Sequence, residues 1–145
     1  DWVYTLSILW PSLINDLSVL IEKSGVPINI ICNGILEIKL QKIKNPEKLR
    51  FIKDEYSILK NQLEKKIKSS GELNELYKSL KEINSKLWVI EDEKRLCEKE
   101  KEFDEKFIKL SREVHFLNDD RAKIKLEINN LTNSKIKEIK EYTSY

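Results

Sequence analysis

Two groups of polar side chains have a spacing that would bring their members together on helices. The first group holds an aromatic ring, two carboxylates and a guanidinium, on Trp88, Glu91, Asp92 and Arg95. The second group holds an amide and two cations separated by three and four residues, on Asn118, Arg121 and Lys125. Because side chains three and four residues apart lie on one face of a helix, each group can form one polar surface.

These two surfaces can meet if their helices run antiparallel. The Arg121 guanidinium would then bind Glu91 or Asp92 through two parallel hydrogen bonds. Glu37 and Lys39, from an earlier segment, could add to the same cluster. We favour the interpretation that these residues form a network between helices that fixes their register. The alternative is a site for a small anion or for the carboxylate of a partner.

The sequence lacks the motifs of the common catalytic and metal sites. It has no glycine-rich phosphate-binding loop and no Ser-His-Asp order. Carboxylates can hold metals inside helical bundles, but Asp92, Glu98 and Glu102 should face outward, because their helix turns Leu, Ile and Cys toward its neighbours. His115 is the only histidine, and we expect it at the surface. We therefore expect no catalytic residue, no cofactor and no metal.

The charge balance and the cysteines exclude further classes of function. The chain has 27 basic and 25 acidic residues, interleaved along its length, for a net charge of +2. Its basic clusters are short and diluted by acids, so we expect no nucleic-acid partner. No apolar run reaches the roughly 18–20 residues that span a membrane. Cys32 and Cys97 are isolated, which favours free thiols in a reducing cytoplasm.

Three long segments have the pattern of helices that pack on other helices. Each carries a seam, defined here as a stripe of apolar residues spaced alternately by three and four. The seams run through Leu49, Ile52, Tyr56, Leu59 and Leu63; through Leu73, Leu76, Leu80, Ile83, Leu87 and Ile90; and through Phe103, Phe107, Leu110, Val114, Leu117, Ile124, Ile128 and Leu131. We expect Lys94, on the second seam, to extend to solvent, and Arg121, on the third, to be paired and partly buried.

The boundaries of the first of these helices are also marked in the sequence. Asn45 is a good N-cap, and Pro46 and Glu47 suit the first turn that follows it. The run from Ser69 to Gly71 should end the helix, with Gly71 in the left-handed conformation of a C-cap.

The segment before Asn45 is ambiguous. Asn33-Gly34 between apolar runs is a strong hairpin signal, yet the residues that follow it suggest a helix. Because the preceding residues are β-branched and alternate weakly, we assign Ile28–Cys32 to a short extended strand. Earlier still, Ser12 could cap a short amphipathic helix.

Several blocks occur in a distinctive order: ILEIK from residue 35, WVIEDEKR from residue 88 and NDDRAKIK from residue 118. Over about residues 26–145 they resemble a family of uncharacterised bacterial proteins, domain-of-unknown-function family 6165. The resemblance implies short cytoplasmic proteins or parts of larger chains, some linked to sugar-transfer enzymes, with no assigned activity. Relative to the family pattern, a short helical stretch is absent between Gly34 and Ile35, which would make Asn33-Gly34 a false hairpin signal.

These observations predict an all-α fold, an antiparallel bundle or helical hairpin with coiled-coil-like seams and a short N-terminal extended segment. Residues 1–25 would form a separate segment, and residues 26–145 a bundle with helices near 35–44, 46–68, 72–100 and 104–131. We expect a non-catalytic interaction or scaffold module that self-associates, with a homodimer favoured and a protein partner as a further possibility. The alternative is an accessory small-ligand domain linked to sugar transfer or polysaccharide synthesis.

Overall fold

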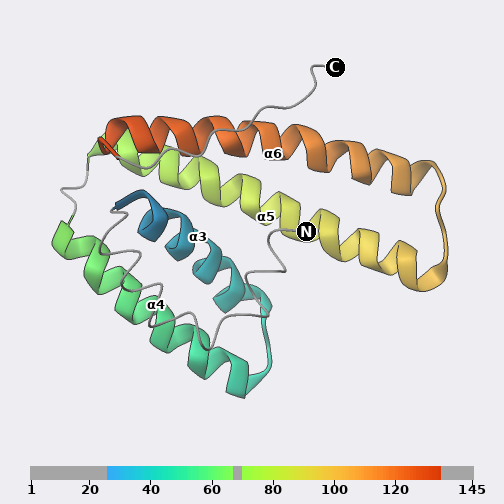
Figure 1. Ribbon diagram of the computed structural model, residues 1–145. Helices are drawn as coiled ribbons and strands as arrows, with labels where there is room; N and C mark the ends of the chain where they lie inside the picture. The colour runs from blue at the N-terminus through green and yellow to red at the C-terminus, as the bar shows by residue number, and fades with distance from the viewer. Residues whose placement is uncertain (1–25, 67–69, 135–145) are drawn as a thin grey trace.

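The computed structural model describes residues 26–66 and 70–134, which form four helices (Figure 1). These are α3 (Val26–Lys42), α4 (Pro46–Lys66), α5 (Gly71–Glu100) and α6 (Glu105–Leu131). The described residues contain no strand, so the predicted all-α class is confirmed. The predicted helix after Ser12 lies outside these residues, and the division of the chain at residue 25 stays a prediction.

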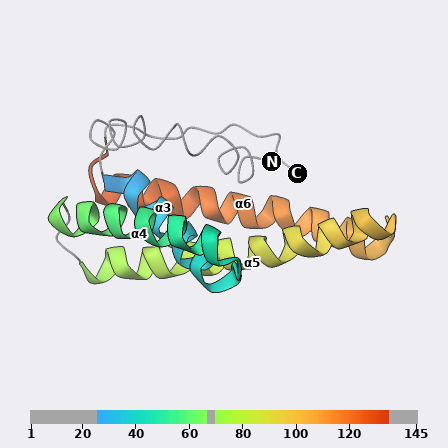
Figure 2. The same cartoon turned by 90° about the horizontal axis from the view of Figure 1, so that it is seen from below.

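The helices alternate in direction along the chain. Contacts of α3 with both α4 and α5 place it between α4 and the antiparallel pair formed by α5 and α6 (Figures 1 and 2). The α5–α6 pair is longer than the other two helices and extends past them at one end. We call this projecting part, residues 89–116, the arm.

Helix α3 is the central helix of the described structure. This position explains why the sequence did not predict a helix over the whole of Val26–Lys42. Ile30, Leu36 and Ile38 are all buried, and α3 contacts each of the other three helices. A helix enclosed in this way needs no polar face and so shows no clear helical period. The strand predicted over Ile28–Cys32 is wrong, because these residues lie within α3. The β-branched side chains of Ile30 and Ile31 pack in a core cluster between helices, and a short apolar run of this kind suits a buried helix as well as a strand.

Helix α3 also runs without a break through Asn33 and Gly34, so no hairpin forms there. Both residues are buried. A Cβ atom added at Gly34 would lie 3.6 Å from Cε2 of Tyr77 on α5, which is an ordinary contact distance. A methyl group at Gly34 would therefore fit beside the Tyr77 ring.

The ends of the helices are capped by short polar side chains. The Asn45 side chain accepts a hydrogen bond from Lys48 N at 3.0 Å, which confirms it as the cap of α4. The predicted role of Gly71 is wrong: it is the first residue of α5, and Ser70 caps that helix by accepting from Leu73 N at 3.2 Å. Ser70 and Gly71, which were predicted to end α4, thus mark the start of α5. Asp104 caps α6 in the same way.

The buried side chains fall into clusters that follow this arrangement. One joins α3 to α4 around Leu36 and Ile52. A second joins α3 to the near ends of α5 and α6 around Ile30, Leu80 and Ile128. The third consists of α5 and α6 residues alone, centred on Ile90, Cys97 and Leu110. Its residues lie in or directly beside the arm, so the arm is held together by two helices.

Candidate functional site

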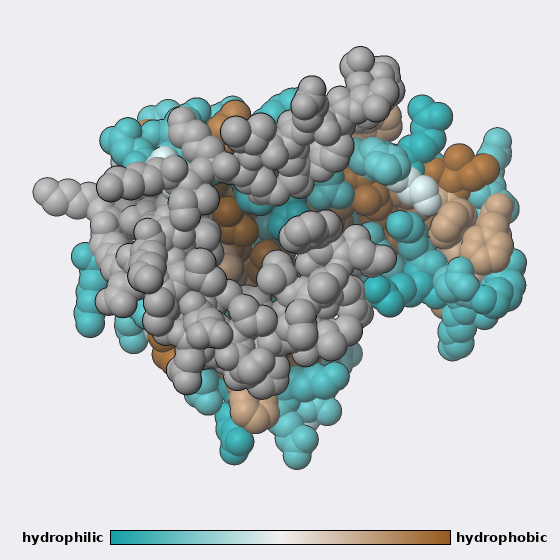
Figure 3. Space-filling view, viewed as in Figure 1, coloured by the Kyte–Doolittle hydropathy of each residue, from teal (hydrophilic) through white to brown (hydrophobic). Residues whose placement is uncertain are grey.

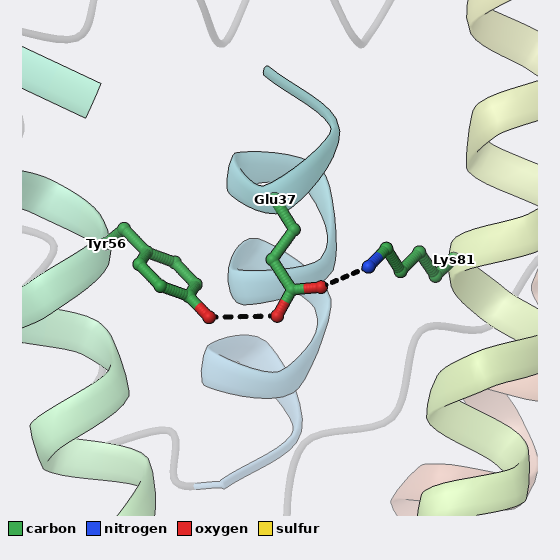
Figure 4. A network of polar contacts seen from close by, with 3 residues as sticks. All are labelled: Glu37, Tyr56 and Lys81. Carbon is green, nitrogen blue, oxygen red and sulfur yellow. Dashed lines mark hydrogen bonds and ion pairs between the residues drawn. The ribbon is translucent and has the colours of Figure 1, made fainter. Parts of the chain in front are cut away.

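The carboxylate of Glu37, on α3, lies at the centre of a polar network that reaches two other helices (Figure 4). Its Oε1 accepts a hydrogen bond of 2.9 Å from the Tyr56 hydroxyl on α4. Its Oε2 accepts a bond of 2.5 Å from Nζ of Lys81 on α5. The Tyr77 hydroxyl, also on α5, donates a further hydrogen bond. The carboxylate therefore connects the central helix to both of its neighbours.

The cluster shifts the titration of its own members. Burial would raise the pKa of Glu37, but the hydrogen bonds from Lys81, Tyr56 and Tyr77 outweigh it and hold the pKa below its ordinary value of 4.5. Burial, and then the bond to Glu37, raises the pKa of Tyr56 to about 12. Burial and the charge of Glu37 also raise the pKa of Tyr77 far above its ordinary value. At neutral pH the cluster thus contains an ionised carboxylate and two protonated phenols.

This protonation pattern suits a structural connection better than acid–base chemistry. A general acid or base works best with a pKa near the operating pH, and the shifts of Glu37 and Tyr56 both lead away from it. Both carboxylate oxygens already accept bonds within the chain. The arrangement joins α4 and α5 to α3 through a part-buried polar network, a kind of contact that can set the register of helices.

Of the residues predicted to form a site, Glu37 thus lies in a network, although not with the predicted partners. Lys39 and Lys125 lie near the Cys32 thiol, because both lower its pKa. Burial and the charge of Glu55 prevail, however, and raise the pKa of Cys32 to about 11. Cys97 is buried, and both cysteines are free thiols.

The two predicted polar groups lie on the paired helices α5 and α6. Leu117 packs in the cluster with Ile90, and Ile124 packs in the cluster with Leu80. Arg121 lies between Leu117 and Ile124 on α6 and is partly buried, as predicted. The pairing of Arg121 with Glu91 or Asp92 stays a prediction.

Glu91 on α5 and Asn118 on α6 each contact a residue of their own helix. Glu91 lies 3.8 Å from Nζ of Lys94 on its own helix. Trp88 is partly buried, and Asp92 and Arg95 are exposed. On α6, the Asn118 amide donates to the carbonyl oxygen of Val114 at 2.9 Å. A ligand-binding role for these residues stays a prediction.

Sequence reasoning missed three of the four members of the Glu37 cluster. Tyr56 was assigned to a seam as an apolar residue, and its hydroxyl was not considered. Tyr77 and Lys81 each directly follow a seam leucine. A usable signal was present at Glu37, an acid within the apolar run ILEIKL, because a partly buried carboxylate requires donors from neighbouring elements. The burial of the polar residue Asn84, on α5, was not predicted either.

A second feature is a groove of about 710 Å³ between α5 and α6, where the arm leaves the bundle. Its lining is mostly apolar, from Val89, Ile90, Leu110, Phe116 and Leu117. Lys42 from the end of α3, Lys86 and two glutamates, Glu93 and Glu113, also border it. Figure 3 shows hydrophobic surface among hydrophilic residues on the arm.

The described residues contain neither a cluster of metal ligands nor a helix suited to crossing a membrane. Within residues 26–66 and 70–134, no group of three or more His, Cys, Asp or Glu side chains could hold a metal ion. His115 is exposed, as predicted. None of the four described helices is long and apolar enough to cross a membrane.

The model of the family of unknown function DUF6165 matches residues 21–145. The chain belongs to this family. The predicted resemblance is thereby confirmed, and the DUF6165 region covers all four described helices, the Glu37 cluster and the arm. Comparisons with curated proteins and with solved structures give no significant match.

Proposed function

We propose that this DUF6165 protein is a non-catalytic interaction module that forms homodimers through its arm. The observation that supports this most directly is the exposed apolar surface of the arm. Five large apolar side chains there are between 43% and 56% exposed, namely Val89, Leu96, Phe103, Ile108 and Phe116. Fully burying a side chain of this kind contributes about 1.5–3 kcal/mol, so covering several would support association.

The construction of the arm supports the same proposal. Its core is a single layer between two helices, whereas the other half of the hairpin is also covered by α3. Packing against another molecule would give the arm the second layer that a helical bundle normally has. Two free thiols fit a reducing compartment, so the proposed setting is the cytoplasm.

Light scattering coupled to size-exclusion chromatography tests the proposal. The wild-type chain should have the mass of a dimer at high micromolar concentration and dissociate on dilution. Phe116→Ser should weaken the dimer. Phe51→Ser is the matched control, because Phe51 is 65% exposed and lies on α4, outside the arm. A wild-type chain that stays monomeric throughout the concentration series would refute self-association.

A further inference from the structure

The groove at the base of the arm has opposite charges at its two ends. Lys42 and Lys86 border the end next to the bundle. Glu93, on α5, borders the groove farther along the arm. Val89 and Ile90 lie between Lys86 and Glu93 on the same helix. From Lys86 to Glu93 there are two helical turns, or about 10 Å. Along α5 the groove is therefore basic, then apolar, then acidic.

A surface with this order is complementary to itself when it is turned end for end. In a dimer with two-fold symmetry, the same patch of each subunit forms the interface. A two-fold axis that crosses α5 near Val89 and Ile90, perpendicular to the helix, would pack α5 antiparallel against its counterpart. Lys86 of each copy would then lie opposite Glu93 of the other, and the apolar residues would meet at the centre.

We propose that the occupant of this groove is a second copy of the chain, in this antiparallel orientation. The inference rests on the proposed function, to which it adds the surface and the symmetry. Lys86 and Glu93 both lie on α5. The pairing of Lys86 of one copy with Glu93 of the other therefore does not depend on how α5 and α6 are aligned within a subunit. Glu93 already lies 3.6 Å from Nζ of Lys106, but its side chain remains 43% exposed and can accept a further cation.

Charge reversal at the two positions tests this geometry. In a Lys86→Glu homodimer, two pairs of glutamates face each other; in a Glu93→Lys homodimer, two pairs of lysines do. Each variant should lose at least about tenfold in dimer affinity, since like charges across an interface cost several kcal/mol. An equimolar mixture of the two variants should regain the dimer, because every opposing pair in the heterodimer is again of opposite sign.

The controls separate this inference from the proposed function. Lys53→Glu makes the same charge change at an exposed position on α4 and should dimerise like the wild type. Glu93→Lys also places a cation beside Lys106, but a variant that failed only for this reason would not be rescued by mixing. If the wild type dimerises and the mixture stays monomeric, or if the single variants dimerise normally, the antiparallel geometry is refuted while self-association stands. A monomeric wild type refutes both.

Discussion

Replacing Glu37 by Gln should destabilise the fold by about 2 kcal/mol at neutral pH, because a hydrogen bond to a charged group contributes about 1.5–3 kcal/mol. The Glu37 carboxylate accepts one bond from Tyr56 and one from Lys81. The Gln amide keeps one acceptor oxygen, so one of the two bonds can persist. Its NH2 group can donate to the Tyr56 oxygen if the acceptor oxygen stays with Lys81, but the charge that strengthens both bonds is lost. The Glu37 side chain is only 24% exposed, so water replaces the lost partner poorly.

Urea unfolding followed by circular dichroism would measure this difference. Glu82→Gln is the matched control, because Glu82 is exposed on α5 and its replacement should change stability by less than about 0.5 kcal/mol. A loss for Glu37→Gln that is no larger than that of the control would refute the assigned role of the cluster.

The pH dependence of the same difference provides a second check. The folded pKa of Glu37 lies below its ordinary value of 4.5, so the stability that it contributes is present above this value. That contribution is lost as the pH falls through the lowered pKa and the carboxylate becomes protonated. The gap between the wild type and Glu37→Gln should therefore narrow in acid, and a gap that stays constant would contradict the electrostatic explanation.

Three further predictions concern single positions. Gly34→Ala should raise the free energy of unfolding by up to about 1 kcal/mol through helix propensity, because the new Cβ meets Tyr77 at an ordinary distance; thermal unfolding would show it. Lys101→Gly should also raise the free energy of unfolding, by about 1 kcal/mol, because Lys101 ends α5 with a φ of 60°. Urea unfolding measures this change, and a lower free energy of unfolding would show that the exposed ion pair of Lys101 with Glu98 contributes more. The raised pKa of Tyr56 implies stability that is complete below pH 10.0 and is lost as the pH approaches about 12, and ultraviolet absorbance should report this phenol ionising only in strong alkali.

The sequence was most informative where a helix has one buried face. The seams of α5 and α6 follow their observed packing at Leu80, Leu87 and Leu110, because a helix with water on its other side must alternate apolar and polar residues. The same reasoning failed at Ile28–Cys32, because enclosure by several helices removes that alternation. Whether a segment is enclosed depends on the whole fold and is not visible in a local window.

The candidate site was predictable only in part, for a related reason. Glu37 could be selected because an acid within an apolar run needs partners. Its partners lie 19 and 44 residues away, on two other helices. Their identity depends on the rotation of each helix about its axis, which spacing does not give. Arg121 shows the same limit: the seams predicted that α5 and α6 pair, and not which residues stand at the same level.

The position of the enclosed helix at the start of the described region has a consequence for how the protein is made. On the ribosome, α3 emerges before α4, α5 and α6, although it has to be covered by all three. Until these helices have been synthesised, the isoleucine-rich surface of α3 lacks the contacts that it makes with them in the final fold. Chains with such exposed apolar surface tend to aggregate or to recruit chaperones. The α5–α6 pair, joined by a short turn, can form from local contacts alone. Helix α3 thus leaves the exit tunnel before the other three described helices, yet it would be among the last of the four to reach its final place.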